Sequence, residues 1–311
     1  FIFVKILKRF KFMSEKVNYE KAWEGGDKPY VASYGKLMMW FFLITDTLTF
    51  SAFLAGYGFS RFKYTDIWPV PEDVFTHFPF LHGNHPLLFV ALMTFILIMS
   101  SVTMVLAVNY GHKMQKNKVI LWLSLTIVGG VMFLGSQAWE WGHFIHGDKG
   151  GIETRTEFVA HIAEGQELSS IYNLMDVDGH DGTTHEFSVE EIILNLEQKT
   201  EFNIRKSDRS FLSNKESITY LNENATQVLL GSNLINNEYG HRLFADYFFF
   251  ITGFHGFHVF SGVVLLIILL INVIKGTYER RGHYEMVEKI GLYWHFVDLV
   301  WVFVFTFFYL V

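Results

Sequence analysis

Cysteine is absent from the 311 residues of this chain, and proline is scarce, with five residues. Without thiols the chain can hold no disulfide, no thiolate metal site and no cysteine nucleophile. A net charge of −6, with no basic stretch interleaved with aromatic residues, argues against a nucleic-acid partner. Apolar residues make up half of the chain, and 33 residues are Phe, a composition typical of a bacterial or organellar membrane protein.

Five apolar runs are long enough to cross a membrane, which takes about 20 mostly apolar residues. Each is bounded by a charged residue or by Pro or Gly, and they cover residues 36–60, 86–110, 118–144, 243–274 and 289–311. The first apolar stretch, Phe1–Val4, is too short for a signal peptide and continues into the basic sequence KILKRFK. MSEK at Met13 resembles a natural start, which predicts that residues 1–12 are an upstream extension of the reading frame; the alternative is a processed N-terminus.

Lysine and arginine are distributed unevenly among the connections between these runs. The segment through Lys36 carries eight, the second and fourth connections carry three and four, and the first connection carries only Arg61 and Lys63. Because cytoplasmic flanks are enriched in Lys and Arg, we expect the N-terminus to be cytoplasmic and the C-terminus periplasmic, in a bacterial inner membrane. The expected organisation is a cytoplasmic tail (1–35), three membrane helices (36–146), a periplasmic acidic insert (147–241) and two further helices (242–311).

The acidic insert, residues 147–241, holds 17 Asp and Glu against seven Lys and Arg. Within it, SVEEIILNLEQKTEF places Ile192, Ile193 and Leu196 at the spacing of an amphipathic helix. Its length allows two or three short strands or helices. Its low apolar content leaves open whether it forms a compact core.

Titratable side chains interrupt four of the five runs, at Asp46, Glu140, His255 with His258, and His295 with Asp298. Such groups are costly in a membrane and usually face the interior of a helical bundle. The histidines and Glu140 could form a buried metal site, or they could donate hydrogen bonds to carboxylates and backbone carbonyls. Asp46 and Glu140 could relay protons, because burial favours the protonated form, or they could join neighbouring helices.

Two stretches carry a resemblance to a known family. FFFITGFHGFHVFSG (248–262) and GLYWHFVDLVWVFVF (291–305) resemble subunit III of cytochrome c oxidase, of the haem–copper oxidase superfamily. Gln137–Glu140 and the Ile-Thr-Asp ending at Asp46 fall where that family has its own helical motifs. The resemblance extends over the five runs and implies an all-α integral membrane fold in the short five-helix bacterial form, with the insert as a departure.

The resemblance also implies a function. Subunit III is non-catalytic, holds no haem or copper, packs against oxidase subunits that do, and binds phospholipid in a cleft. Asp46 and Glu140 match carboxylates related to proton uptake, although Asp46 is one methylene shorter than the Glu usual in the family. The remaining matches imply contacts between helices or with the lipid cleft, and they are His255, His258, Trp294, His295 and Asp298.

The predicted function is therefore a supporting subunit of an oxidase that takes electrons from cytochrome c, reduces oxygen to water and pumps protons. We expect subunits I and II and phospholipids as partners, no catalytic or metal-ligating residue in this chain, and haem and copper in the partner subunits. The acidic insert is expected to contact cytochrome c or a neighbouring respiratory complex. The alternatives are the equivalent subunit of a quinol oxidase, or a stand-alone five-helix transporter or metal-binding membrane protein.

Overall fold

The computed structural model describes residues 33–79, 85–155, 158–177 and 186–310. Two units divide the chain, residues 1–40 and residues 41–311. The first contributes only the beginning of one helix to the described residues, and the contacts given below lie within the second. The proposed start at Met13 and almost all of the predicted tail, residues 1–35, lie outside the described residues.

Among the described residues, five helices are long and apolar enough to cross a membrane. They are α3 (Tyr34–Lys63), α5 (Leu88–His112), α6 (Lys116–His146), α10 (Arg242–Ile274) and α12 (Glu285–Phe305), which continues as a π-helical turn, Thr306–Leu310. The five predicted runs are confirmed, with ends that differ by a few residues, because each run is mostly apolar and is bounded by charge, Pro or Gly. Shorter helical pieces connect them: a 3₁₀ turn (Thr65–Ile67), α4 (Pro71–Val74) and α11 (Thr277–Arg281).

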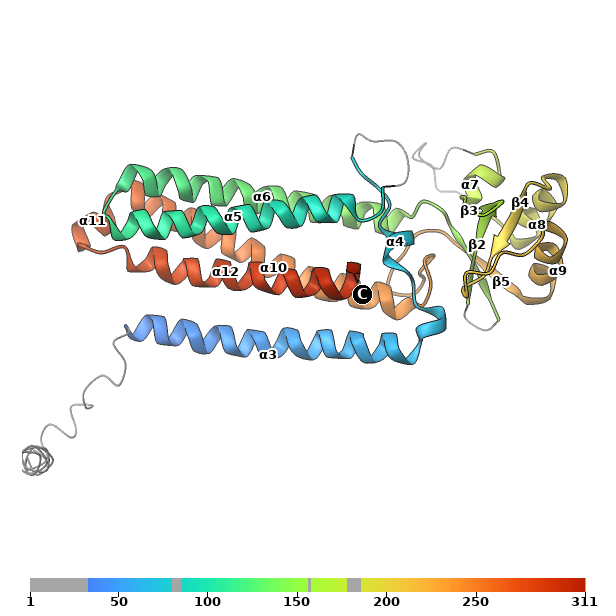
Figure 1. The fold of residues 1–311 in the computed structure, drawn as a ribbon, viewed down its shortest axis with the longest axis horizontal. Helices are drawn as coiled ribbons and strands as arrows, with labels where there is room; N and C mark the ends of the chain where they lie inside the picture. Colours follow the sequence, from blue (N-terminus) through green and yellow to red (C-terminus); the bar gives the residue numbers. More distant parts are fainter. Residues whose placement is uncertain (1–32, 80–84, 156–157, 178–185, 311) are drawn as a thin grey trace, which may run out of the picture. The chain divides into compact units, whose positions relative to one another are not determined.

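Four of the long helices pack against one another in a closed ring, with α5 beside α6, α6 beside α10, α10 beside α12 and α12 beside α5. Figure 1 shows these four helices running alongside each other. Small residues permit the close approach, since a Cβ at Gly130 would lie 2.6 Å from the Trp294 ring. We call α5, α6, α10 and α12 the four-helix group.

Helix α3 contacts the four-helix group mainly through aromatic side chains. Phe50 lies 5.0 Å from Phe254 between ring centroids, and Phe53 lies 4.8 Å from Phe250. Tyr57 lies 4.1 Å from Phe308. These large aromatic side chains keep the backbone of α3 further from the four-helix group than the helices within the group are from one another. The wider spacing leaves room for a cleft beside α3.

The acidic insert is an α+β unit, not a loop. Its elements are β1 (Gly151–Thr154), β2 (Val159–Glu164), β3 (Glu167–Leu168), α7 (Ile171–Leu174), α8 (Val189–Gln198), β4 (Phe202–Arg205), α9 (Asn214–Asn224) and β5 (Ala225–Leu229). The strands are antiparallel in the order β3-β2-β1-β5, and β4 also pairs with β2. The membrane part is all-α as predicted, and the insert adds a five-stranded sheet to it.

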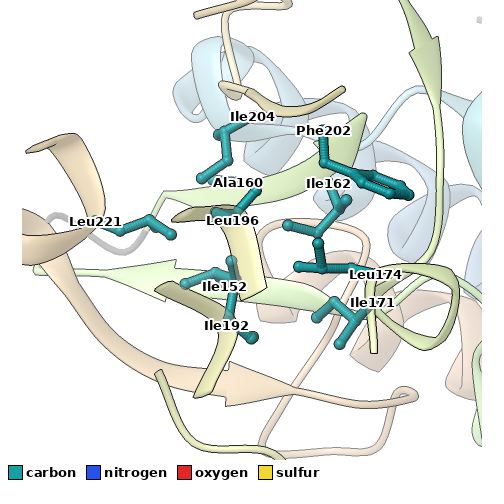
Figure 2. Packing of buried hydrophobic residues seen from close by; sticks show 10 residues of the cluster. All are labelled: Ile152, Ala160, Ile162, Ile171, Leu174, Ile192, Leu196, Phe202, Ile204 and Leu221. Carbon is teal, nitrogen blue, oxygen red and sulfur yellow. The ribbon is translucent and has the colours of Figure 1, made fainter. Parts of the chain in front are cut away.

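The insert has a hydrophobic core of its own, which its composition left undecided. Helix α8 forms where the amphipathic pattern predicts it and buries Ile192 and Leu196 completely. Both α8 and α9 begin with a Ser–Glu capping box, at Ser188 and Ser213. Figure 2 shows the core side chains converging between the sheet and the helices: Ile152, Ala160, Ile162, Ile171, Leu174, Ile192, Leu196, Phe202, Ile204 and Leu221.

Candidate functional site: polar contacts between the helices

Asp46 of α3 faces His258 of α10 across the aromatic contact between these helices. The Asp46 Oδ2 atom lies 3.3 Å from His258 Nε2, and the two side chains are 16% and 9% exposed. The other ring nitrogen, Nδ1, lies 2.8 Å from the Phe254 carbonyl oxygen one turn earlier, the geometry of an Nδ1–H donating to that oxygen. Phe50 and Phe254 flank the imidazole edge-on. The carboxylate and imidazole therefore form a pair shielded by aromatic rings.

His255 is fully buried, on the side of α10 that meets α12. Its Nε2 lies 3.1 Å from the Val297 carbonyl oxygen, and its Nδ1 has no hydrogen-bond partner among the described residues. The rings of Phe133 and Trp301 lie 5.7 and 5.1 Å away. His255 thus contacts backbone and aromatic rings, and among the described residues neither His258 nor Glu140 shares a hydrogen bond with it.

Glu140 lies in α6 and is 5% exposed. Its Oε2 accepts hydrogen bonds from Gln137 Nε2 at 2.9 Å and from the Tyr309 hydroxyl at 3.0 Å. Its Oε1 has no partner among the described residues. Because Tyr309 follows α12, the carboxyl group joins the end of that segment to α6.

Trp294, His295 and Asp298 connect α12 to α5 through adjacent serines. Trp294 Nε1 donates to Ser100 Oγ at 3.1 Å. His295 Nδ1 lies 2.6 Å from Ser101 Oγ, and the same hydroxyl also bonds the Asp298 carboxyl group. These three residues act as polar links between two helices of the four-helix group.

An apolar cleft of about 350 Å³ lies between α3 and the end of α12. The wall from α3 comprises Thr47, Phe50, Ser51, Leu54 and Ala55, and the opposite wall comprises Phe296, Leu299, Val300, Phe303 and Phe307. Of the residues that the sequence associated with a lipid cleft, none lines this space, although Phe296 and Leu299 are their neighbours on α12. The sequence could not identify the walls because apolar residues on a membrane helix carry no distinguishing pattern.

Glu238, which sequence reasoning missed, joins the two ends of the acidic insert. It is 1% exposed, and Oε1 accepts from the amides of Asp148 and Lys149 while Oε2 accepts from that of Gly231. Burial raises the pKa of this carboxyl group. Gly147 is the sequence feature that belongs to this contact. Its φ of +71° and its closeness to Glu238 leave no room for a side chain, which explains the glycine.

The predicted residues therefore fall into separate contacts. The structure brings together Asp46 with His258, and His295 with Asp298 through Ser101, whereas Glu140 and His255 lie in contacts of their own. Taken with the five long apolar helices, these contacts define a multi-pass helical membrane protein whose titratable groups link its helices.

Comparison with known proteins finds similarity to one family in the last part of the chain. Residues 235–311 match the family model of cytochrome c oxidase subunit III. This segment contains α10 and α12, so the similarity to that family lies in the last two spans. Similar proteins include a probable cytochrome c oxidase subunit 3 of Rickettsia conorii, 40% identical over 108 residues, which are 31% of this chain and 37% of the relative.

Two further relatives come from distant organisms. The cytochrome c oxidase subunit 3 of Synechocystis is 46% identical over 69 residues, which are 22% of this chain and 29% of the relative. That of Marchantia polymorpha is 44% identical over 64 residues, 21% of this chain and 24% of the relative. The chain therefore spans between 24% and 37% of the length of these three relatives. The family model does not reach Asp46 or Glu140.

Proposed function

We propose that this chain is the non-catalytic subunit III of a terminal haem–copper oxidase that takes electrons from cytochrome c, reduces oxygen to water and pumps protons. The observation that carries the proposal is the family match over residues 235–311. That segment supplies five of the polar and aromatic residues singled out from the sequence, and each makes a contact within this chain. In this proposal haem and copper are held by subunits I and II, and this chain has no thiolate for a paired copper site.

The cleft between α3 and α12 is the proposed phospholipid site. Its walls are apolar except for the hydroxyls of Thr47 and Ser51, and its volume of about 350 Å³ suits part of an acyl chain. Hydrocarbon in this space would cover aromatic rings that otherwise face a void, which is favourable at about 25 cal/mol per Å² of buried apolar surface. Lipid would thereby connect α3 to the four-helix group.

Asp46 and Glu140 are proposed to support proton uptake by the catalytic subunit. Asp46 lies 12 residues into α3 from Tyr34, about 18 Å along the helix axis at 1.5 Å per residue. It is paired with an imidazole that can exchange a proton with it. In this proposal the carboxylate–imidazole pair is the point at which this chain holds protons for the catalytic subunit.

The proposed location is the bacterial inner membrane, with the N-terminus in the cytoplasm and the acidic insert and C-terminus in the periplasm. The Lys and Arg counts of the connections support this orientation. The acidic insert is proposed to contact cytochrome c or a neighbouring respiratory complex. Complementary charge would raise the rate of encounter with a basic partner, so the salt dependence of turnover tests this contact.

Purification through a tag on this chain, from native membranes in mild detergent, tests the proposal. Mass spectrometry should find a haem-bearing subunit I and a subunit II in stoichiometric amounts with the tagged chain. A subunit II with paired copper-binding cysteines would support cytochrome c as the electron donor. A subunit II without these cysteines would indicate quinol as the electron donor. A tagged chain that elutes alone would contradict the proposed function.

A further inference from the structure

Three potential metal ligands meet where the acidic insert joins the end of α6. His77 follows α4, His143 lies in the last turn of α6, and Asp148 is the second residue after that helix. One ligand atom from each side chain lies within 4.8 Å of the others. None of the three is among the residues that the sequence singled out as ligands, because their positions span 71 residues and come from three different segments.

The side chains of this cluster already face one another. His77 Nδ1 lies 2.8 Å from Asp148 Oδ2. The His77 and His143 rings are stacked at 5.1 Å between centroids, with planes 15° apart. Trp139 packs 4.0 Å from the His143 ring and fixes its position on the helix.

Asp148 provides a second, independent indication of a ligand. Its side chain is only 10% exposed. Its Oδ1 atom is buried without a hydrogen-bond partner among the described residues. An unpaired buried carboxylate oxygen is costly because it has lost its water without gaining a donor, and a cation would remove that cost.

Space for an ion is present beside the three side chains. A small cavity of about 20 Å³ is lined by His77, His143 and Asp148 and extends to Glu140. A volume of roughly 10–15 Å³ on this measure holds one water. The cavity therefore has room for one ion-sized or water-sized species.

We propose that His77, His143 and Asp148 bind a divalent transition-metal ion, with Zn²⁺ as the best fit. Two imidazoles and one carboxylate suit Zn²⁺ at about 2.0–2.2 Å per bond and leave a fourth position for water. Ca²⁺ and Mg²⁺ are poor candidates, since they prefer oxygen ligands throughout. Closing the site requires side-chain rotation that replaces the His77–Asp148 contact by two bonds to the metal.

The bound ion would tie three segments together at one point. His77 belongs to the connection between α3 and α5, His143 to α6, and Asp148 to the start of the acidic insert. Glu238 already holds the Asp148 amide, so the metal would extend that network to the helices. This site goes beyond the proposed oxidase function and departs from the expectation that the chain holds no metal.

Zinc titration of the full-length chain, purified in detergent with a histidine-free tag and stripped with a chelator, tests the site. We expect one Zn²⁺ per chain by calorimetry. The variants His77→Ala, His143→Ala and Asp148→Asn should each raise Kd at least tenfold. His146→Ala is the matched control, because His146 is exposed on the same turn of α6 and is not part of the cluster; its Kd should stay within twofold of the parent.

A second measurement uses the unmutated chain, so its result does not depend on whether the variants fold. X-ray absorption of the 1:1 Zn²⁺ complex should show about two imidazole nitrogens with oxygen completing the shell. No stoichiometric binding, a shell of oxygen alone, or an affinity that the three ligand variants leave unchanged would each overturn the proposal.

Discussion

Buried titratable residues in this chain find partners on helices that are distant in sequence. Asp46 and His258 are 212 positions apart, and Glu140 and Tyr309 are 169 apart. Sequence reasoning identified Asp46, Glu140 and the histidines from the cost of placing such groups in a membrane. It could not identify the pairs, because the pairing depends on how the helices are rotated and on which aromatic residues separate them.

Asp46→Asn tests the role of the Asp46–His258 pair. Asparagine is close in size but cannot take up and release a proton, so initial oxygen reduction by the complex should stay near the parent rate. Proton uptake should slow, or catalytic lifetime should shorten severalfold, when followed over many turnovers in purified oxidase. Asp246→Asn, the same change at a half-buried Asp of α10 outside the Asp46–His258 pair, is the control and should behave as the parent does. If Asp46→Asn has the proton uptake and catalytic lifetime of the parent, the proposed role of Asp46 in proton uptake is excluded.

Glu140 allows packing and proton transfer to be separated. Glu140→Ala leaves the buried Tyr309 hydroxyl and Gln137 amide without their acceptor, which should destabilise the fold by about 2 kcal/mol or more. Glu140→Gln keeps an acceptor oxygen and should lose less stability while still slowing proton uptake. Thermal midpoints in detergent and proton-uptake rates measure the two effects. Equal midpoints for both variants would show that these hydrogen bonds contribute little.

At the scale of elements, the long helices were predictable and the sheet was not. Each membrane helix is a continuous apolar run, and this local signal needs no knowledge of the rest of the chain. The strands of the insert have two to six residues, and β1 pairs with β5, so that Gly151 lies opposite Leu229. Short strands with distant partners leave little local pattern, and the many acidic residues obscured the small core.

His161 makes the sheet of the insert sensitive to acid. Burial lowers the pKa of this β2 side chain to about 4, while the unfolded value is 6.5. Between these values the unfolded chain binds a proton that the folded chain excludes, so stability falls as pH falls from 6.5 toward 4. The full difference corresponds to about 3 kcal/mol.

Hydrogen–deuterium exchange of β2 amides, corrected for the intrinsic effect of pH, measures this loss. The buried Glu238 has a raised pKa and acts with the opposite sign, because its contribution declines as pH rises above 4.5. The comparison is therefore between the parent and His161→Gln, which keeps a donor for the Glu238 carbonyl but does not titrate. If both lose protection equally between pH 6.5 and 4, another group causes the sensitivity.

At the scale of the whole molecule, the insert can be removed without separating the helices. Gly151 and Leu229 are paired, so residues 152–228 can be replaced by a two-residue turn while the Glu238 carboxylate keeps the amides of Asp148, Lys149 and Gly231. We expect assembly to persist and turnover with cytochrome c to lose part of its salt dependence. Neutralising the exposed Glu190, Glu197 and Glu201 to Gln should weaken that dependence without changing the fold. Unchanged salt dependence in both variants would exclude the insert as a docking surface.

The central claim is that this chain belongs to an oxidase whose redox centres lie in other subunits. The reduced-minus-oxidised haem spectrum of material purified through the tagged chain tests it most directly. The account predicts haem in a fixed ratio to the tagged chain in mild detergent, and a colourless chain once a harsher detergent separates the subunits. Haem that stays with the isolated chain, or no haem in the mild preparation, would contradict it.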